Sequence, residues 1–416
     1  MKRTEIYKIT VLKETTLYTM GNYNILKTFC KRIFLVGSGN FWYEKAEIGD
    51  DSRIYYKTFS LILYFAYCFM TLLEIMAVFM GDLPDDERRD SITLSVSHPV
   101  VMIKIFSIMY NKKTIRQYLY DIEHVCKAHE KESLIKERYR SMKLNVIVYS
   151  LTVYSSAACF VLEGVKKAYS GSHFITVVTY YPSHNDNTHM AIFIRILNTI
   201  ILLMMLLNMI IVDGFTIVNL IILKDKFITL RHYFEDLRAD VEKLCQIGNY
   251  EMAGERLSNG VIAGIVMHKE LLRLSNVVDN VFGTAMAFQL CQSSGAAVSL
   301  MLLFALSEHL TLIATLRIIT FVVALFLLLG LFLCNSGEIT YQASLLPNAI
   351  FYCGWHICPQ KYHGRQLGKI LSIACMQAQQ PLAMKAFKMF EITYVTFLQV
   401  VRGTYSVFAL IYAQNE

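Results

Sequence analysis

The stretch MAIFIRILNTIILLMMLLNMIIVDGFTIVNLII, residues 190–222, decides the class of this fold. It carries only two charged side chains, Arg195 and Asp213. About 20 mostly apolar residues suffice to cross a bilayer as a helix. The stretch continues without a turn residue into LKDKFITLRHYFEDLRADVEKLCQ, residues 223–246. Apolar residues there recur at steps of four and three, which predicts one helix that leaves the membrane and enters water.

Six further apolar runs of spanning length accompany this one. Hydrophobic residues make up 55% of the chain and charged residues 18%, which excludes an ordinary soluble domain. The sequence therefore predicts an all-α membrane protein with seven transmembrane helices. The seven runs are Thr58–Met80, Ser91–Tyr110, Val146–Val165, Met190–Ile222, Phe282–Leu306, Leu312–Asn335 and Met389–Ala413.

The positive charges are sorted between the segments that join these runs. Of the 40 Lys and Arg residues, 32 lie before the first run or in every second connection, and four lie in the other connections. Cytoplasmic loops carry the excess of positive charge, so the N-terminus is expected in the cytoplasm and the C-terminus outside. This orientation is the reverse of that of a G-protein-coupled receptor. It also explains the net charge of +7 without nucleic-acid binding.

The runs divide the chain into six expected parts. A cytoplasmic segment, 1–57, precedes helices one to four, 58–222, and it contains no signal-peptide core, so the first run is expected to start insertion. A cytoplasmic extension of helices four and five, 223–281, leads to helices five and six, 282–335. A cytoplasmic anchor element, 336–388, precedes the last helix and its short tail, 389–416.

The cytoplasmic extension is expected to contain two helices. The first carries the apolar stripe described above, and the second is expected over Val261–Val278, after Gly254–Gly260. Two such helices must bury their stripes, which predicts a helical bundle either within one subunit or between subunits.

Several short motifs near the C-terminus resemble those of one family. They are Cys334-Asn-Ser-Gly-Glu338, Ser344, Ala349-Ile-Phe-Tyr352, Trp355, Pro381, Phe397 and Tyr405-Ser406, preceded by Val266-Met-His268-Lys-Glu-Leu271, Asp213 and Tyr181-Pro182. Their order and spacing are similar to those of the insect odorant receptors, over nearly the whole chain. One departure is Gly354, where many members have Pro.

The resemblance implies a function and a set of partners. It implies a tetrameric, odorant-gated, non-selective cation channel of the plasma membrane, in which this subunit binds a volatile odorant or pheromone and assembles with a shared co-receptor. The segment 223–276 is shorter than that of the co-receptor, which implies the tuned subunit. The expected subunit interface includes Phe234, Leu237, Trp355 and Pro381.

The last run is the expected pore helix. Its polar residues Thr396, Gln399, Gly403 and Ser406 share one helical face, which predicts either a wet pore or packing against neighbouring helices. The resemblance instead places the narrow gate at Phe408, Ile411 and Tyr412, on a different face. Arg402 is unexpected in a cation pore and is expected to pair elsewhere, with Glu391 as one partner.

A ligand cavity is expected in the outer half of the bundle, between runs two, three, four and six. The candidate lining residues are mostly apolar, which suits a volatile ligand, although ordinary helix packing is the favoured explanation for each residue taken alone. They are Ser95, His98, Met102, Tyr154, Ala157, Phe160, Phe193, Ile194, Leu197, Ile313, Leu316 and Thr320. The charged residues Glu74, Lys104, Asp213 and Arg317 are expected to pair inside the bundle or near its ends.

Other function classes have less support. No spacing of Ser, His, Cys or acidic residues suggests a catalytic triad, a metal site or a cofactor site, so we do not expect an enzyme. A gustatory-type receptor channel shares the expected architecture, and a metabotropic seven-helix receptor would require the opposite orientation. A secondary transporter would show inverted repeats, and none is visible.

Overall fold

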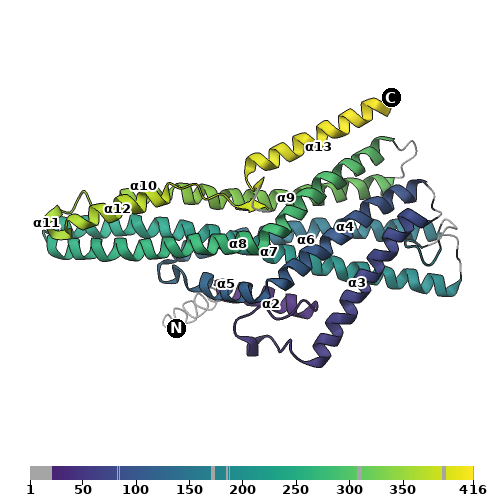
Figure 1. Ribbon diagram of the computed structural model, residues 1–416, viewed down its shortest axis with the longest axis horizontal. Helices are drawn as coiled ribbons and strands as arrows, with labels where there is room; N and C mark the ends of the chain where they lie inside the picture. Colours follow the sequence, from purple (N-terminus) through teal and green to yellow (C-terminus); the bar gives the residue numbers. More distant parts are fainter. Residues whose placement is uncertain are drawn as a thin grey trace, which may run out of the picture.

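A computed structural model describes residues 21–81, 83, 85–169, 174–183, 186, 188–306, 312–386 and 390–415. Helices form almost all of this part of the chain (Figure 1). In chain order the elements are α2 Asn22–Leu35, a 3-10 turn Lys45–Glu47, α3 Ile54–Met80, α4 Asp85–Tyr110, α5 Lys112–His124, a 3-10 turn Lys127–His129, α6 Glu132–Tyr169, α7 His189–Gln246, α8 Tyr250–Leu306, α9 Leu312–Ser344, α10 Leu346–Phe351, α11 Gln360–His363, α12 Arg365–Ala378, β1 Lys385–Ala386, β2 Phe390–Glu391 and α13 Tyr394–Asn415.

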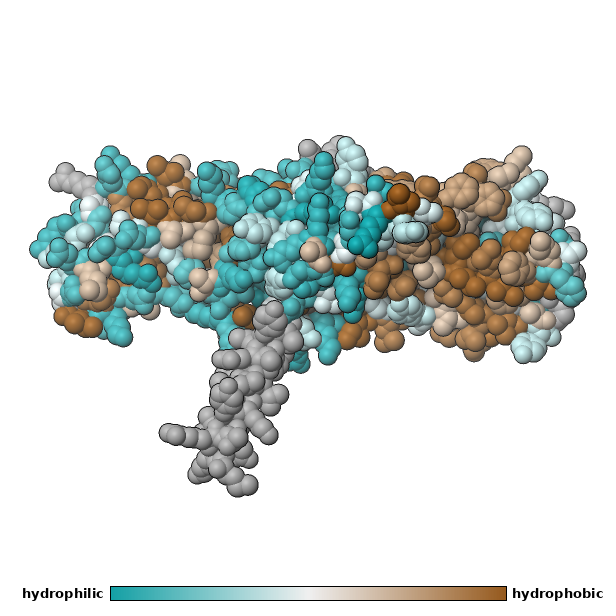
Figure 2. Space-filling model, turned by 90° about the horizontal axis from the view of Figure 1, so that it is seen from below, coloured by the Kyte–Doolittle hydropathy of each residue, from teal (hydrophilic) through white to brown (hydrophobic). Residues whose placement is uncertain are grey.

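Seven helices within the described ranges are long and apolar enough to cross a membrane: α3, α4, α6, α7, α8, α9 and α13. Apolar side chains gather at one end of the elongated molecule and polar side chains cover most of the other end (Figure 2). This distribution fits a bundle in lipid joined to a helical stalk in water. The predicted fold class is confirmed.

The stalk is formed by α7 from residue 223 to Gln246 and by α8 from Tyr250 to residue 281, with α10, α11 and α12 packed along them (Figure 1). The prediction that the fourth apolar run and residues 223–246 form one unbroken helix is confirmed. The chain reverses at Gly248, which has a positive φ of 82°. The second stalk helix begins at Tyr250 rather than after Gly254–Gly260, because these glycines lie inside the helix.

Three glycines of α8 allow the stalk helices to approach closely. A Cβ atom on Gly264 would lie 2.3 Å from Phe234 Cζ, and one on Gly260 would lie 2.5 Å from Leu237 Cδ1. A Cβ atom on Gly254 would lie 2.4 Å from the carbonyl oxygen of Tyr362 in α11. Only hydrogen fits at these three positions, so the glycines act as packing surfaces.

These contacts correct the prediction that Phe234 and Leu237 belong to a subunit interface. Both side chains are fully buried between α7 and α8 of the same chain, so neither is available to a second subunit. Trp355 is half-buried and donates its indole N–H to the carbonyl of Phe351 at 2.8 Å, while Pro381 is exposed. Of the four predicted interface residues, only Trp355 and Pro381 lie at the surface of the chain.

Two expected boundaries differ from the structure. The sixth spanning helix, α9, does not end at Asn335 but continues to Ser344. The last helix begins at Tyr394, and a short antiparallel pair precedes it, in which Lys385 faces Glu391 and Ala386 faces Phe390. The predicted start at Met389 lies outside the described residues.

A buried charge cluster joins the stalk to the base of the bundle. The carboxylate of Glu130 contacts Arg138 Nη2 at 2.9 Å and Lys226 Nζ at 2.7 Å. Burial alone would raise the pKa of Glu130, but the two cations outweigh it and hold the pKa below its usual value. Lys226 also donates to the carbonyl of Val125, so one ammonium fastens α7 to the turn that precedes α6.

We expect Gly264→Ala to destabilise the protein, because the added methyl group must displace the buried ring of Phe234. Overpacking a core costs about 1–3 kcal/mol, which exceeds the roughly 1 kcal/mol that Ala gains over Gly in a helix. Gly295→Ala is the matched control in the same helix, since a Cβ atom there meets nothing within 4 Å. Thermal unfolding of the purified proteins, followed by tryptophan fluorescence, measures both. Equal melting temperatures for the two variants would contradict the close packing.

Candidate functional site

A cavity of about 70 Å³ lies inside the bundle, between α4, α6, α7, α8 and α9. Most of its wall is aliphatic or aromatic, and Ser97, His98, Ser156 and Gln292 supply its polar groups. Pockets that hold drug-sized ligands typically have volumes of about 300–1,000 Å³. A ligand larger than the present cavity of about 70 Å³ therefore requires side chains of the wall to move. The remaining lining residues are Leu94, Val101, Val153, Ala157, Phe160, Val161, Leu202, Leu203, Leu206, Met209, Phe321 and Ala324.

Three of the twelve predicted ligand residues, His98, Ala157 and Phe160, line this cavity. Met102 is buried but lies outside the lining, and Ser95 donates its hydroxyl to the carbonyl of Ile92 in its own helix. The others also lie outside the lining: Ile194, Ile313 and Thr320 are half-buried, while Tyr154, Phe193, Leu197 and Leu316 have 48%, 62%, 43% and 48% of their surface exposed.

The predicted residues differ from the lining of this cavity in helix rotation and in depth, for a physical reason. On α4 the lining passes through Leu94, Ser97 and Val101, about one residue away from the predicted face. On α7 it begins only at Leu202, more than one turn after Leu197. In a run that is apolar on all sides, hydrophobic spacing does not distinguish the lipid-facing side from the inner side. The weak signal that was missed is the set of polar residues Ser97, Ser156 and Gln292 within apolar runs.

His98 has an acidic partner. Its Nδ1 lies 2.6 Å from Glu74 Oε2 on α3, and both side chains are almost fully buried. Pro99 follows His98 inside α4. Because proline has no backbone N–H, the helix lacks one of its backbone hydrogen bonds next to His98. The predicted pairing of Glu74 inside the bundle is confirmed.

A second buried network crosses the centre of the bundle, one helical turn from the cavity. Lys104 Nζ on α4 donates to Asp213 Oδ2 on α7 at 2.9 Å and to Gln289 Oε1 on α8 at 2.8 Å. Tyr149 of α6 donates to the same Asp213 oxygen at 2.8 Å. The side-chain amide of Gln289 donates to the hydroxyl of Ser293, and that hydroxyl donates to the carbonyl of Leu325 on α9. Five helices therefore share one hydrogen-bonded network.

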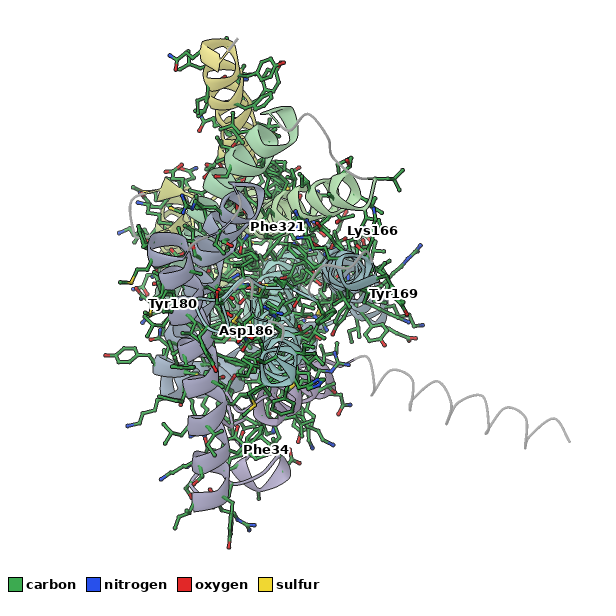
Figure 3. The ribbon with its side chains drawn as sticks, turned by 90° about the vertical axis from the view of Figure 1, so that its right-hand side faces the viewer. Phe34, Lys166, Tyr169, Tyr180, Asp186 and Phe321 are labelled. Carbon is green, nitrogen blue, oxygen red and sulfur yellow. The ribbon has the colours of Figure 1, made fainter. Side chains whose placement is uncertain are left out.

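The end of the bundle away from the stalk is closed by a loop and an ion pair. The amide of Tyr180 donates to the carbonyl of Leu73 at 2.9 Å, and the hydroxyls of Thr176 and Thr199 lie 2.6 Å apart. Figure 3 views the molecule from this end and shows Tyr180 and Asp186 of this loop in front of the helices. These contacts tie the loop to α3 and α7.

Arg317 of α9 forms the ion pair at this end. It lies 3.0 Å from Glu163 of α6 and 5.0 Å from the ring centre of Phe160, a residue of the cavity wall. The predicted pairing of Arg317 is confirmed. A pair that touches the wall holds α6 and α9 together directly beside the cavity.

A larger groove lies at the other end of the bundle, between α2, α6 and α7. Its volume is about 570 Å³, and Arg32 and Lys143 contribute to its wall. Two cations in an open groove do not suit an uncharged volatile molecule, so the internal cavity is the better candidate for such a ligand.

The predicted pore helix, α13, stands apart from the bundle over much of its length (Figure 1). Gln399 and Ser406 are exposed, whereas Phe408, Ile411 and Tyr412 are half-buried. Phe408 and Tyr412 stack with ring centres 5.9 Å apart. The described residues include no ion pair between Arg402 and Glu391, so the pairing suggested for Arg402 is wrong.

Lys104→Met should destabilise the protein strongly, because it leaves the Asp213 carboxylate buried without its cation. Breaking a buried pair costs about 3–5 kcal/mol. The double variant Lys104→Met, Asp213→Leu removes both charges and should recover much of that loss. Lys136→Met is the control, since its pair with Glu132 is solvent-exposed and worth at most about 1 kcal/mol. Thermal unfolding compares the four proteins, and a double variant less stable than Lys104→Met would refute the pairing argument.

Comparison with known proteins agrees with this geometry. The sequence model of the family described as 7tm Odorant receptor matches residues 88–405, which is most of the chain. No curated protein matches the sequence. The fold is similar to that of the insect olfactory receptor OR5 from Machilis hrabei in complex with eugenol, with a TM-score of 0.76, 12% identity, and coverage of 95% of this chain and 100% of that one. A second structure of that receptor gives a TM-score of 0.75 at 14% identity. The match covers 94% of this chain and 99% of that one. The chain therefore belongs to the odorant receptor family.

Proposed function

We propose that this odorant receptor is the ligand-tuned subunit of an odorant-gated, non-selective cation channel, which it forms with a shared co-receptor subunit in the plasma membrane. The proposed complex is a heterotetramer with one copy of α13 from each subunit around the pore. The observation that best supports this proposal is the exposure of α13. A receptor that works as a single chain would not explain why this helix is so little buried.

Only 6% of the apolar window of α13 is buried within the chain, against 22–44% for the other six spanning helices. Its exposed surface includes Gln399, Arg402 and Ser406. Polar groups in the hydrocarbon region prefer a protein interior or a water-filled path. A ring of such helices from several subunits gives these side chains water on one side and protein on the other.

The gate is proposed at Phe408, Ile411 and Tyr412, with Gln399 and Ser406 in the wider part of the pore. The two sets occupy different faces of α13, as about 100° of rotation per residue places Phe408 nearly opposite Gln399. A ring of apolar side chains closes a pore by dewetting. Ligand binding shifts the closed–open equilibrium only by the difference in affinity for the two states.

The ligand is proposed to be a volatile odorant or a pheromone held in the cavity next to His98, Ala157 and Phe160. The wall is mainly apolar and carries few polar groups, which is the usual composition of a site for a small organic ligand. A receptor of the same fold is described in complex with eugenol, a small volatile phenol. The network of Lys104 and Asp213 beneath the cavity links it to α8, on which α13 packs.

The proposed orientation places the N-terminus and the stalk in the cytoplasm and the C-terminus outside. The basic residues support it, because 32 of 40 precede the first spanning run in the sequence or belong to every second connection, as the stalk segment does. Membrane lipid then covers the exposed apolar side chains of the bundle. An enzymatic activity or nucleic-acid binding has no part in this proposal.

Whole-cell recording tests the proposal directly. The chain is expressed alone and together with the co-receptor, with G-protein signalling blocked, and a panel of volatile odorants is applied. We expect a rapid cation current that requires the co-receptor. A response that the G-protein block abolishes would overturn the channel proposal and favour the alternative, a metabotropic receptor.

Cysteine modification tests the proposed pore surface. Ser406→Cys should become sensitive to a charged, membrane-impermeant thiol reagent applied from outside during odorant stimulation, because this side chain faces water in the open pore. Val407→Cys is the comparison, since Val407 is 46% exposed, apolar and about 100° around the helix from Ser406, as suits contact with lipid. Loss of odorant-evoked current is the measurement. A block at position 407 but not at position 406 would contradict the assignment.

A further inference from the structure

The pair of His98 and Glu74 decides which hydrogen-bonding groups the cavity offers. Nδ1 of His98 faces Glu74 Oε2 at 2.6 Å, and His98 and Glu74 are 4% and 1% exposed. His98 lines the cavity and Glu74 does not. The Nδ1 edge of the ring is therefore turned to α3, and the edge with Nε2 is left for the cavity.

The position of the proton on Nε2 follows from the charge of the pair. If both residues are ionised, both ring nitrogens carry a proton. If the proton stays on Glu74, the carboxyl O–H donates to Nδ1, and the neutral ring carries its single proton on Nε2. The pair is neutral overall in both states, and Nε2 is a donor in both.

The remaining states are disfavoured by burial. A neutral ring with its proton on Nδ1 beside an ionised Glu74 leaves one net negative charge, and a protonated ring beside a neutral carboxyl leaves one net positive charge. A net charge away from water is costly, and Glu74 Oε1 has no hydrogen-bond partner among the described residues to stabilise an ionised carboxylate beside a neutral ring. Within the described part of the chain, His98 is the one cationic residue at ion-pair distance from Glu74.

The donor on Nε2 is free to meet a ligand. Among the described residues none accepts a hydrogen bond from it. The hydroxyl of Ser97, next to it on the cavity wall, is also buried and has no partner there. Around these two groups the wall is apolar, so a ligand acceptor placed in the cavity meets a fixed N–H and an adaptable hydroxyl.

We infer that His98 Nε2 is a hydrogen-bond donor fixed by Glu74, and that the ligands of this chain are apolar molecules with a hydrogen-bond acceptor, such as ketones, aldehydes, esters or ethers. This inference rests on the proposed ligand cavity and narrows its ligand class. A hydrocarbon leaves the donor unsatisfied. An alcohol binds through its oxygen lone pair, so its own O–H is dispensable.

Binding is measured by displacement of a fluorescent, apolar naphthylamine probe from the purified receptor in lipid nanodiscs. The competitors are a straight-chain ketone, the corresponding secondary alcohol and the hydrocarbon of the same length, for each member of a homologous series. We expect the ketone and the alcohol to bind about ten-fold more tightly than the hydrocarbon, as for one hydrogen bond from a charge-assisted donor.

His98→Leu should reduce the advantage of the ketone over the hydrocarbon to less than about two-fold, because the donor is gone. His98→Gln keeps an N–H donor of similar reach and should retain part of the advantage, so it covers the case in which the leucine variant does not fold. Ser95→Ala is the control on the same helix, because Ser95 bonds within its own helix and does not line the cavity.

Two results would overturn the inference. One is a ketone that binds as weakly as the hydrocarbon while the alcohol binds tightly, since Nε2 would then be an acceptor. The other is a ketone advantage that is absent, or unchanged in His98→Leu. Currents from the receptor with its co-receptor are recorded in parallel. Normal displacement without any current would refute the proposed channel function and leave the ligand class standing.

Discussion

The buried ion pair between Lys104 and Asp213 is the interaction on which the arrangement of the bundle depends. In lipid, apolar side chains gain little by leaving their surroundings, so packing and hydrogen bonds must fix the positions of the helices. The pair and its partners Tyr149 and Gln289 join α4, α6, α7 and α8 at one point. The cost of separating these charges in a low-dielectric interior holds the four helices in one arrangement and leaves the cavity beside them with a defined wall.

The two ends of the molecule are stabilised by different kinds of interaction. In the stalk, water restores the hydrophobic driving force, and the glycines of α8 let Phe234 and Leu237 pack against its backbone. In the bundle, buried pairs add polar contacts between the packed helices, as in the pairs of His98 with Glu74 and of Arg317 with Glu163. The helix α13 belongs fully to neither part. Its polar and apolar surfaces are both exposed, so the chain alone does not account for its sequence.

The sequence was sufficient for the parts of the fold that depend on long, strong patterns. The length of the apolar runs identified the seven spanning helices. The apolar stripe from Leu223 to Val241 identified the unbroken α7, because the opposite face of that segment is polar. The same reasoning failed for the cavity, where Ser95, Tyr154 and Phe193 were chosen from runs that are apolar all round. Which side of such a helix faces inward depends on its neighbours, and here the buried charges fix it. Phe234 was predicted at a subunit interface, whereas it packs on Gly264 of the same chain. Glycine has no side chain, so the apolar pattern of α8 did not reveal this contact.

The central claim is that the polar face of α13 is completed by other subunits around a shared pore. Electron cryo-microscopy of the complex with the co-receptor in lipid nanodiscs tests this most directly. The claim predicts four helices around one axis, with Gln399 and Ser406 of this chain turned to a water-filled path and Trp355 and Pro381 near the neighbouring stalks. A complex in which α13 lies against lipid on all sides, or in which its polar face packs on α8 of its own chain, would contradict it.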